Sequence, residues 1–307
     1  MIFCTDEAYL PFASLAIHTL LRSNPVRDYD ICIASLDPLD LPAELRAHDI
    51  RLCQIDVGDA FDGMPVSKRF SIETYLRIAL PEAFQGQYSR ILYLDSDVFV
   101  VGDALDTIFH LDLMNYPVGA VTDITKLKHP DRPTFDQKAL GLDGPYFNSG
   151  VMLLDVERFI AARVRARCAE AAQFYQGKLI YFDQTLLNIV LQNERAQLNM
   201  GWNWQWSFAR SLFECFIDVQ IVHFIGADKP WSAHRCKLPL KYREITRRYF
   251  QKFYPELAQK IPATDEPLGN GALFRYFFRH MTKIYLFTKG FNRHCGDLNK
   301  VLPPDLR

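Results

Sequence analysis

Two acids flank a serine directly after an apolar run, and this stretch is well suited to chemistry. In "RILYLDSDVFV", the run Ile91 to Leu94 predicts a buried strand, and Asp95 and Asp97 follow it. Ligands of open α/β sheets bind beyond the carboxyl ends of the strands, so both carboxylates are expected to face a site. Two carboxylates one residue apart can hold one divalent cation, which is often shared with substrate phosphates. The alternative is a turn in which the aspartates cap backbone amides.

The same short motif also fits a second class of enzyme. Phosphohydrolases of the haloacid dehalogenase type use the first acid of Asp-x-Asp as a nucleophile. They usually place Thr or Val where this chain has Phe99, and they carry a downstream lysine and a second acidic pair. The sequence contains no Asp-Asp pair, and "GDALD" follows Asp97 too closely to come from a separate strand. A phosphohydrolase is therefore the runner-up interpretation.

The segments around the motif alternate between short apolar runs and helical patterns, which is typical of an α/β domain. Besides the run before Asp95, the predicted strands are "MIFCTD", "DYDICIASL", "IRLCQIDV", "YPVGAVTD", "PYFNSGVMLLDV" and "QIVHFIG". Helices are predicted over residues 10–21, 71–84, 156–176 and 183–192. A change of composition at Ile261 to Gly271 predicts a boundary, with a catalytic domain over residues 1–260 and a C-terminal segment over residues 261–307.

The composition is that of a globular protein. With 307 residues, 49% of them hydrophobic, the chain can bury a large core. A formal net charge of −1 provides no overall field that would attract nucleic acid. The 7 cysteines lack CxxC spacing, which argues against a zinc site or a disulfide framework and favours reduced thiols in a cytosolic protein. The sequence also predicts neither a membrane span nor a signal peptide.

Three later segments follow "YLDSDVFV" in order: "PYFNSGVMLLDV", "FDQTLLN" and "VHFIGADKPW". Together with "FCTDEAY" near the start, they resemble the family 8 retaining glycosyltransferases, a group that contains bacterial lipopolysaccharide galactosyl- and glucosyltransferases and glycogenin. The resemblance extends from Phe3 to Trp231, about three quarters of the chain. It implies a GT-A type, Rossmann-like mixed sheet flanked by helices, with a small helical C-terminal appendage. The implied reaction moves galactose or glucose from a UDP-sugar to a saccharide of the lipopolysaccharide or lipooligosaccharide core, with an α linkage.

The resemblance implies that Asp95, Asp97 and His223 hold Mn²⁺, with Mg²⁺ as an alternative. Two carboxylates and one imidazole suit an octahedral ion that keeps positions for diphosphate oxygens. Such an ion would stabilise the charge on a departing nucleoside diphosphate. A lone histidine is more often structural, but His223 ends an apolar strand and precedes Gly226 and Lys229, which suit a phosphate site.

The nucleotide site is expected to include residues after the first strand. Asp6 matches the acid that reads the base in the family, and Tyr9 matches the aromatic residue that stacks on it. Ser96, between the two acids, is also assigned to the nucleotide. Ala8 replaces an asparagine that is common in relatives, and a core aromatic is the alternative for Tyr9.

The sugar pocket implied by the resemblance consists of Arg77, Asp123, Asn148, Asp183 and Gln184. Without the resemblance, Arg77 would be placed on a solvated helix face, and both aspartates would be read as helix or turn caps.

Gln184 and Asp183 are the catalytic candidates. Retaining hydrolases use a carboxylate nucleophile about 5 Å from a second carboxyl group. The amide of Gln184 is a poor nucleophile, so the sequence favours front-face displacement, in which the leaving diphosphate assists deprotonation of the incoming hydroxyl. A covalent intermediate on Asp183 is the alternative.

The C-terminal segment "LFRYFFRHMTKIYLFTKGFNRH" contains no acid and interleaves aromatic residues with Arg275, Arg279, Lys283, Lys289 and Arg293. Such a helix can lie in the interface of an anionic membrane, or it can pack on the catalytic domain. The resemblance favours the membrane, because bacterial members act on lipid-linked saccharides at the cytoplasmic face. The expected partners are thus a UDP-sugar donor, a saccharide or lipid-linked acceptor and an anionic membrane surface, without nucleic acid. A cytoplasmic protein held at the inner face of the plasma membrane is expected. A nucleotide-sugar-binding protein without turnover is a third alternative.

Overall fold

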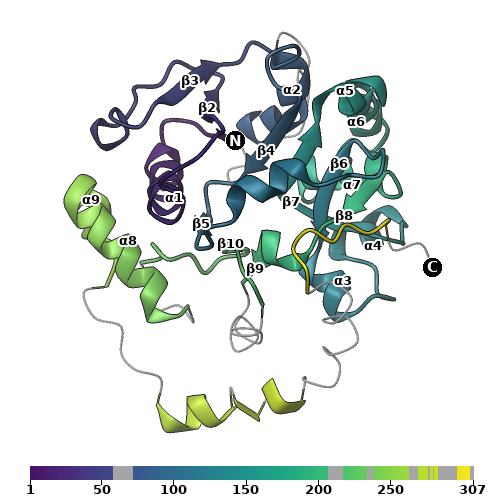
Figure 1. The fold of residues 1–307 in the computed structure, drawn as a ribbon. Helices are drawn as coiled ribbons and strands as arrows, with labels where there is room; N and C mark the ends of the chain where they lie inside the picture. Colours follow the sequence, from purple (N-terminus) through teal and green to yellow (C-terminus); the bar gives the residue numbers. More distant parts are fainter. Residues whose placement is uncertain are drawn as a thin grey trace.

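A mixed sheet forms the centre of the protein. The structure, a computed structural model, describes residues 1–57, 72–206, 217–233, 238–262, 269–275, 277, 278, 280–282 and 296–304. Within these residues, seven strands form the main sheet in the order β3-β2-β1-β4-β7-β6-β8 (Figure 1). Their bounds are β1 (Ile2–Cys4), β2 (Ile31–Ser35), β3 (Ile50–Gln54), β4 (Arg90–Leu94), β6 (Val118–Thr122), β7 (Phe147–Asp155) and β8 (Arg195–Gln197).

The direction of β7 decides which residues meet at the end of β4. Strands β3, β2, β1 and β4 run parallel to one another. β7 runs antiparallel to both β4 and β6, whereas β8 runs parallel to β6. The beginning of β7 therefore lies beside the carboxyl end of β4, with Val151 opposite Leu94.

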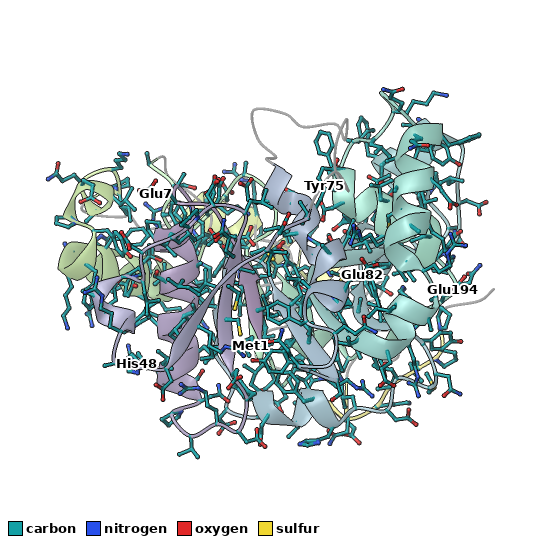
Figure 2. The ribbon with its side chains drawn as sticks, turned by 90° about the horizontal axis from the view of Figure 1, so that it is seen from above. Met1, Glu7, His48, Tyr75, Glu82 and Glu194 are labelled. Atoms are coloured by element: carbon teal, nitrogen blue, oxygen red, sulfur yellow. The ribbon has the colours of Figure 1, made fainter. Side chains whose placement is uncertain are left out.

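Helices cover both faces of the sheet, which explains why β4 is apolar on both sides. Leu92 and Leu94 belong to the core shared with α1 (Leu10–Ser23) and α8 (Leu240–Phe253). Ile91 and Tyr93 belong to the opposite core, which contains residues of the other long helices. These are α2 (Leu76–Ala83), α5 (Val156–Ala161), α6 (Val164–Phe174) and α7 (Phe182–Leu191). Figure 2 looks down on this arrangement, with Tyr75 directly before α2 and Glu82 within it.

The predicted long elements are present, with two differences in the helices. The helix expected over residues 156–176 is divided into α5 and α6 at Arg163, which has a φ of 51°. The helix expected over residues 71–84 begins with a 3₁₀ turn, η3 (Ile72–Tyr75), before α2, and Ser71 lies outside the described residues. The shorter elements are η1 (Ala43–Leu45), η4 (Leu105–His110), η5 (Met200–Asn203), α3 (Ile124–Lys128), α4 (Phe135–Leu140) and α9 (Pro255–Ala258).

A second, smaller sheet joins distant parts of the chain. Its order is β5-β10-β9, formed by β5 (Val98–Val100), β10 (Ile221–His223) and β9 (Trp204–Gln205). β5 begins directly after Asp97, and β10 pairs with it in antiparallel fashion, so that His223 lies opposite Val98. Neither β5 and β9 nor this pairing was predicted from the sequence.

The C-terminal segment has two described parts. The helical residues between 270 and 282 lie apart from the main sheet in Figure 1, with Phe274, Phe277 and Phe278 exposed. Residues 296–304 instead return to the sheet, where Leu302 exchanges backbone hydrogen bonds of 2.7 and 3.0 Å with Gln197. The division at residue 260 stays a prediction.

Parts of the predicted basic-aromatic tail lie outside the described residues, among them Arg279, Lys283, Lys289 and Arg293. Among the helices that the structure describes, none has the length and apolar character needed to cross a membrane.

Candidate metal centre and adjoining cavity

Asp95 and Asp97 lie where the chain passes from the main sheet into the small one. The backbone N–H of Asp95 donates to the carbonyl of Gly150 at 2.8 Å, which continues the pairing of β4 with β7. The carbonyl of Asp97 accepts from the N–H of Phe224 at 3.0 Å, which continues the pairing of β5 with β10. Both acids are therefore held by backbone hydrogen bonds on either side of a short turn.

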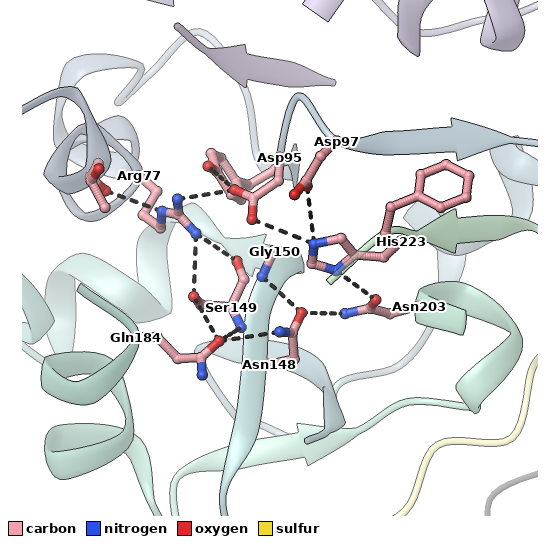
Figure 3. A network of polar contacts seen from close by, with 12 residues as sticks. Arg77, Asp95, Asp97, Asn148, Ser149, Gly150, Gln184, Asn203 and His223 are labelled. Atoms are coloured by element: carbon pink, nitrogen blue, oxygen red, sulfur yellow. Dashed lines mark hydrogen bonds and ion pairs between the residues drawn. The ribbon is translucent and has the colours of Figure 1, made fainter. Parts of the chain in front are cut away.

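His223 joins the two acids because β10 pairs with β5. Its Nε2 lies 3.1 Å from Oδ1 of Asp97 and 3.7 Å from Oδ2 of Asp95 (Figure 3). The three side chains offer ligand atoms that all lie within 4.8 Å of one another. The arrangement agrees with the predicted ligand set.

The donor set fits a divalent cation. Oδ1 of Asp97 is buried and accepts no hydrogen bond of standard geometry, although Nε2 of His223 is near. A buried carboxylate oxygen without a donor is costly unless a positive charge compensates it. Two carboxylates and one imidazole match the preferences of Mn²⁺ and related ions.

Gly150 makes room for this group of ligands. A Cβ atom at this position would lie 2.2 Å from Cε1 of His223 and 2.5 Å from Oδ2 of Asp95. Both contacts are far below van der Waals distances. The absence of a side chain at residue 150 is therefore a requirement of the metal group.

Arg77 connects the metal group with a second acid. Its guanidinium places Nη2 at 2.9 Å from Oδ1 of Asp95 and Nε at 3.0 Å from Oδ2 of Asp183. Nη1 donates to the carbonyl of Ser149 at 3.1 Å, and the centroid of the Tyr93 ring lies 4.5 Å from the guanidinium carbon. Arg77 is 8% exposed, so the alternative of a solvated helix face is wrong.

The titration of these acids follows from their different partners. Burial acts to raise the pKa of Asp97, but Lys229 and His223 outweigh it and hold this pKa well below its usual range. Burial raises the pKa of Asp183 to about 6, although Arg77 opposes the shift. Burial alone would lower the pKa of Arg77, but Asp183 and Asp95 raise it above its usual value.

Amide side chains form the other side of the group. Oε1 of Gln184 accepts hydrogen bonds from the N–H of Ser149 at 3.1 Å and from Nδ2 of Asn148 at 3.2 Å. Nε2 of Gln184 donates to the hydroxyl of Tyr146 at 3.4 Å, and that hydroxyl donates to Asp136. The amide predicted for catalysis is therefore fixed at both ends.

A cavity of about 230 Å³ opens beside the two acids. It contains seven of the predicted site residues, namely Asp6, Tyr9, Arg77, Asp95, Ser96, Asp97 and Lys229. Oδ1 of Asp6 accepts the N–H of Tyr9 at 2.8 Å, and Tyr9 is 52% exposed, so the core interpretation of this tyrosine is wrong. Lys229 forms an ion pair with Asp97 and also donates to the carbonyl of Phe224.

The remaining predicted residues do not line this cavity. Asp183 is 3% exposed and pairs with Arg77, and Figure 3 shows Asn148 and Gln184 below Arg77 and Gly150. Gly226 lies in an exposed turn after β10, with a φ of +86°. Asp123 caps α3, where its Oδ1 accepts the N–H of Thr125 at 2.7 Å, as the capping alternative predicted.

Several residues at the site were not among the predicted site residues. Glu73 and Thr74 line the cavity, and the hydroxyl of Tyr93 donates to Oδ1 of Asp95 at 2.5 Å. Asn203 is 1% exposed and contacts His223 from η5. The polar residues that begin β7 could have indicated that Ser149 lies at the site. The segment "GWNW" has no pattern that distinguishes Asn203 from a structural asparagine.

The fold and the site define an α/β protein with a candidate metal centre beside a cavity of about 230 Å³. The sequence model described as Glycosyl transferase family 8 matches residues 1–235, so this chain belongs to that family. Lipopolysaccharide glucosyltransferase WaaO of Escherichia coli (strain K12) is 27% identical over 247 residues, which cover 77% of this chain and 70% of WaaO. Lipopolysaccharide 1,3-galactosyltransferase of Salmonella typhimurium (strain LT2) is 24% identical over 311 residues, which cover 97% and 89% of the two chains.

A solved structure shows the same fold. The galactosyltransferase LgtC, crystallised with donor and acceptor sugar analogs, superposes with a TM-score of 0.67 at 22% identity. The match covers 86% of this chain and 97% of LgtC. The predicted GT-A type mixed sheet flanked by helices is therefore confirmed.

Proposed function

We propose that this protein is a metal-dependent retaining glycosyltransferase that moves galactose or glucose from a UDP-sugar to a saccharide acceptor with an α linkage. One observation carries the proposal: Asp95 and Asp97, which with His223 form the three-ligand group, line the same cavity as Asp6 and Lys229. A cation and a nucleoside diphosphate bound there would be neighbours. Membership of family 8 supports a glycosyl transfer rather than the phosphohydrolase alternative.

Asp95, Asp97 and His223 would hold Mn²⁺, with Mg²⁺ as the alternative ion. The bound ion would neutralise charge on the diphosphate and stabilise it as a leaving group. Lys229 would add a second positive charge to the same phosphates. Since its ammonium group pairs with Asp97 in the structure, we expect it to turn towards the diphosphate when the donor binds.

The nucleoside would lie at the end of β1. Asp6 would accept hydrogen bonds from the base, and the exposed ring of Tyr9 would stack on it. Ser96 would contact the nucleotide from the turn between the acids, and Gly226 would let the backbone approach the diphosphate. The sugar would then lie towards Arg77, which lines the same cavity.

The sugar side would consist of Arg77, Asp123, Asn148, Asp183 and Gln184. For the chemical step we favour front-face displacement, because the amide of Gln184 is a poor nucleophile and the carboxylate of Asp183 is bound to Arg77. The leaving diphosphate would assist deprotonation of the acceptor hydroxyl while Gln184 and Asp183 stabilise the oxocarbenium-like sugar. A covalent intermediate on Asp183 remains the alternative, and it requires that Asp183→Asn abolish transfer.

The acceptor is proposed to be a saccharide of the lipopolysaccharide or lipooligosaccharide core, as the names of the related transferases suggest. The protein would then work in the cytoplasm at the inner face of the plasma membrane. Exposed Phe274, Phe277 and Phe278, together with Arg275, support peripheral attachment through the C-terminal segment. Full-length protein should bind vesicles with anionic lipid at low salt, and a chain ending at Gly271 should not.

The deciding experiment measures UDP release from a panel of UDP-sugars, with Mn²⁺ and with a chelator. We expect metal-dependent release from one hexose donor, lost in Asp95→Asn and kept in the control Asp106→Asn, an exposed acid in η4. Binding of UDP without release, even with saccharide acceptors present, would instead favour a binding protein without turnover. Release of inorganic phosphate would favour the phosphohydrolase.

A further inference from the structure

Asn203 links the predicted metal ligand His223 with the amides on the sugar side. It lies in η5 and is almost fully buried. Its Oδ1 is 3.1 Å from Nδ1 of His223, and its Nδ2 donates to Oδ1 of Asn148 at 2.8 Å. Figure 3 shows the chain of contacts continuing from Asn148 to Gln184.

The direction of each hydrogen bond in this chain is fixed by backbone groups. The N–H of Gly150 donates to one end of the Asn148 amide at 3.1 Å, so that atom must be the oxygen, Oδ1. The atom of Asn203 that faces it must then be a donor, the nitrogen Nδ2. The N–H of Ser149 fixes Oε1 of Gln184 as an acceptor in the same way, which agrees with the donation from Asn148.

The tautomer of His223 follows from this order. Since Nδ2 of Asn203 faces Asn148, its Oδ1 faces the imidazole and can only accept. Nδ1 of His223 must therefore carry the proton. When Nε2 carries no proton, its lone pair is aimed at Asp97 and Asp95, where a metal ligand is needed.

We propose that Asn203 is a positioning residue, which holds His223 in the Nδ1–H tautomer and joins the metal group to Asn148 and Gln184. The part of this proposal that concerns the metal rests on the proposed function. Partners of the non-ligating nitrogen commonly orient metal-bound histidines, and their loss lowers metal affinity by about 10- to 100-fold. Asn203 serves in this way from η5.

The tautomer can be tested without metal or substrate. Long-range ¹H–¹⁵N NMR on metal-free protein with labelled histidine distinguishes the Nδ1–H, the Nε2–H and the doubly protonated ring, and a His223→Gln variant assigns the signals. We expect a proton on Nδ1 in the parent protein, in the Nδ1–H or the doubly protonated ring, and a share of rings with bare Nδ1 in Asn203→Leu, which has a similar shape but no polar atoms. An Nε2–H form in the parent protein would overturn the proposal.

The metal consequence is tested by titrating Mn²⁺ and following the free ion by electron paramagnetic resonance. Asn203→Leu should bind Mn²⁺ about 10- to 100-fold more weakly. In Asn203→Asp the new carboxylate still accepts from Nδ1 of His223, and a carboxylate is a common partner of metal-bound histidine. The Mn²⁺ affinity of this variant should therefore stay within about threefold of the parent. Its carboxylate cannot donate to Asn148, so UDP release should fall by roughly tenfold in kcat with KM little changed.

A variant of the same helical turn controls for general damage. Asn199→Leu removes a cap of Gly201 and two bonds to the backbone of Gly296 and Asp297, but no contact to His223. It should lower the melting temperature and leave Mn²⁺ affinity unchanged. If the parent binds no Mn²⁺, the proposed function fails while the tautomer result still decides the role of Asn203. If the parent and Asn203→Leu bind Mn²⁺ equally, the role of Asn203 is refuted.

Discussion

Replacing Gly150 by alanine tests whether the metal group depends on the missing side chain. The new Cβ would lie 2.2 Å from Cε1 of His223, whereas carbon atoms normally approach to about 3.5 Å, so the ring must move by roughly 1.3 Å. The ring cannot retreat easily, because Nδ1 is held by Asn203 and the backbone by β10. Oδ2 of Asp95, 2.5 Å from the Cβ, is displaced as well. Since two of three ligands move, Mn²⁺ affinity should fall by about 100-fold or more.

The matched control is Gly119→Ala in the neighbouring strand β6. Its Cβ would meet Leu113 at 2.7 Å and Leu198 at 3.0 Å, so it overpacks the core without touching a ligand. Both variants should lose about 1–3 kcal/mol of unfolding free energy in urea. Only Gly150→Ala should lose Mn²⁺ binding by calorimetry and metal-dependent UDP release. A Gly150→Ala protein with parental Mn²⁺ affinity would refute the assignment of His223 and Asp95 as joint ligands.

Three further predictions concern Arg77 and two residues that do not line the cavity, Asp183 and Tyr146. Burial raises the pKa of Asp183 to about 6, so the folded protein keeps a proton there that the unfolded chain releases. Metal-free stability should thus fall by roughly 3 kcal/mol between pH 4 and 6, and urea unfolding of Asp183→Asn should lack this part of the pH dependence. Arg77→Gln leaves the carboxylates of Asp95 and Asp183 without their cation, so the free energy of unfolding should fall by about 3–5 kcal/mol at pH 7. The loss should be smaller at pH 5, where Asp183 is protonated, and equal losses at both pH values would contradict this. Tyr146→Phe removes the acceptor of the Gln184 amide, so kcat for UDP release should fall about tenfold at constant KM, and a change in KM alone would argue against an orienting role.

The fold was predictable where burial patterns are strong. The apolar run before Asp95 belongs to a central strand covered on both faces, and such strands are apolar throughout. The short strands β5 and β9 have 3 and 2 residues and depend on pairing with β10. Their apolar residues carry no period that separates them from loops, so local patterns could not identify them.

The site was predictable only through residues that belong to motifs. The spacing of Asp95 and Asp97 indicated a cation site, but His223 lies far along the chain and reaches it through the pairing of β10 with β5. Burial of Arg77 could not be inferred from its helix, because the pattern of a helix does not show which acids lie opposite. The family resemblance indicated site roles for both His223 and Arg77, whereas the role inferred for Asn203 required the three-dimensional structure.

The reversed direction of β7 explains how an α/β sheet can form this site. In a fully parallel sheet, the residues that begin a strand lie at the edge opposite to the carboxyl ends. Here β7 is antiparallel to β4, so its first residues lie beside Asp95. The N–H groups of Ser149 and Gly150 thereby orient the amides of Gln184 and Asn148 next to the acids. Gly150 leaves space for the metal ligands in the same stretch, so one strand reversal supplies both the open space and the fixed amides.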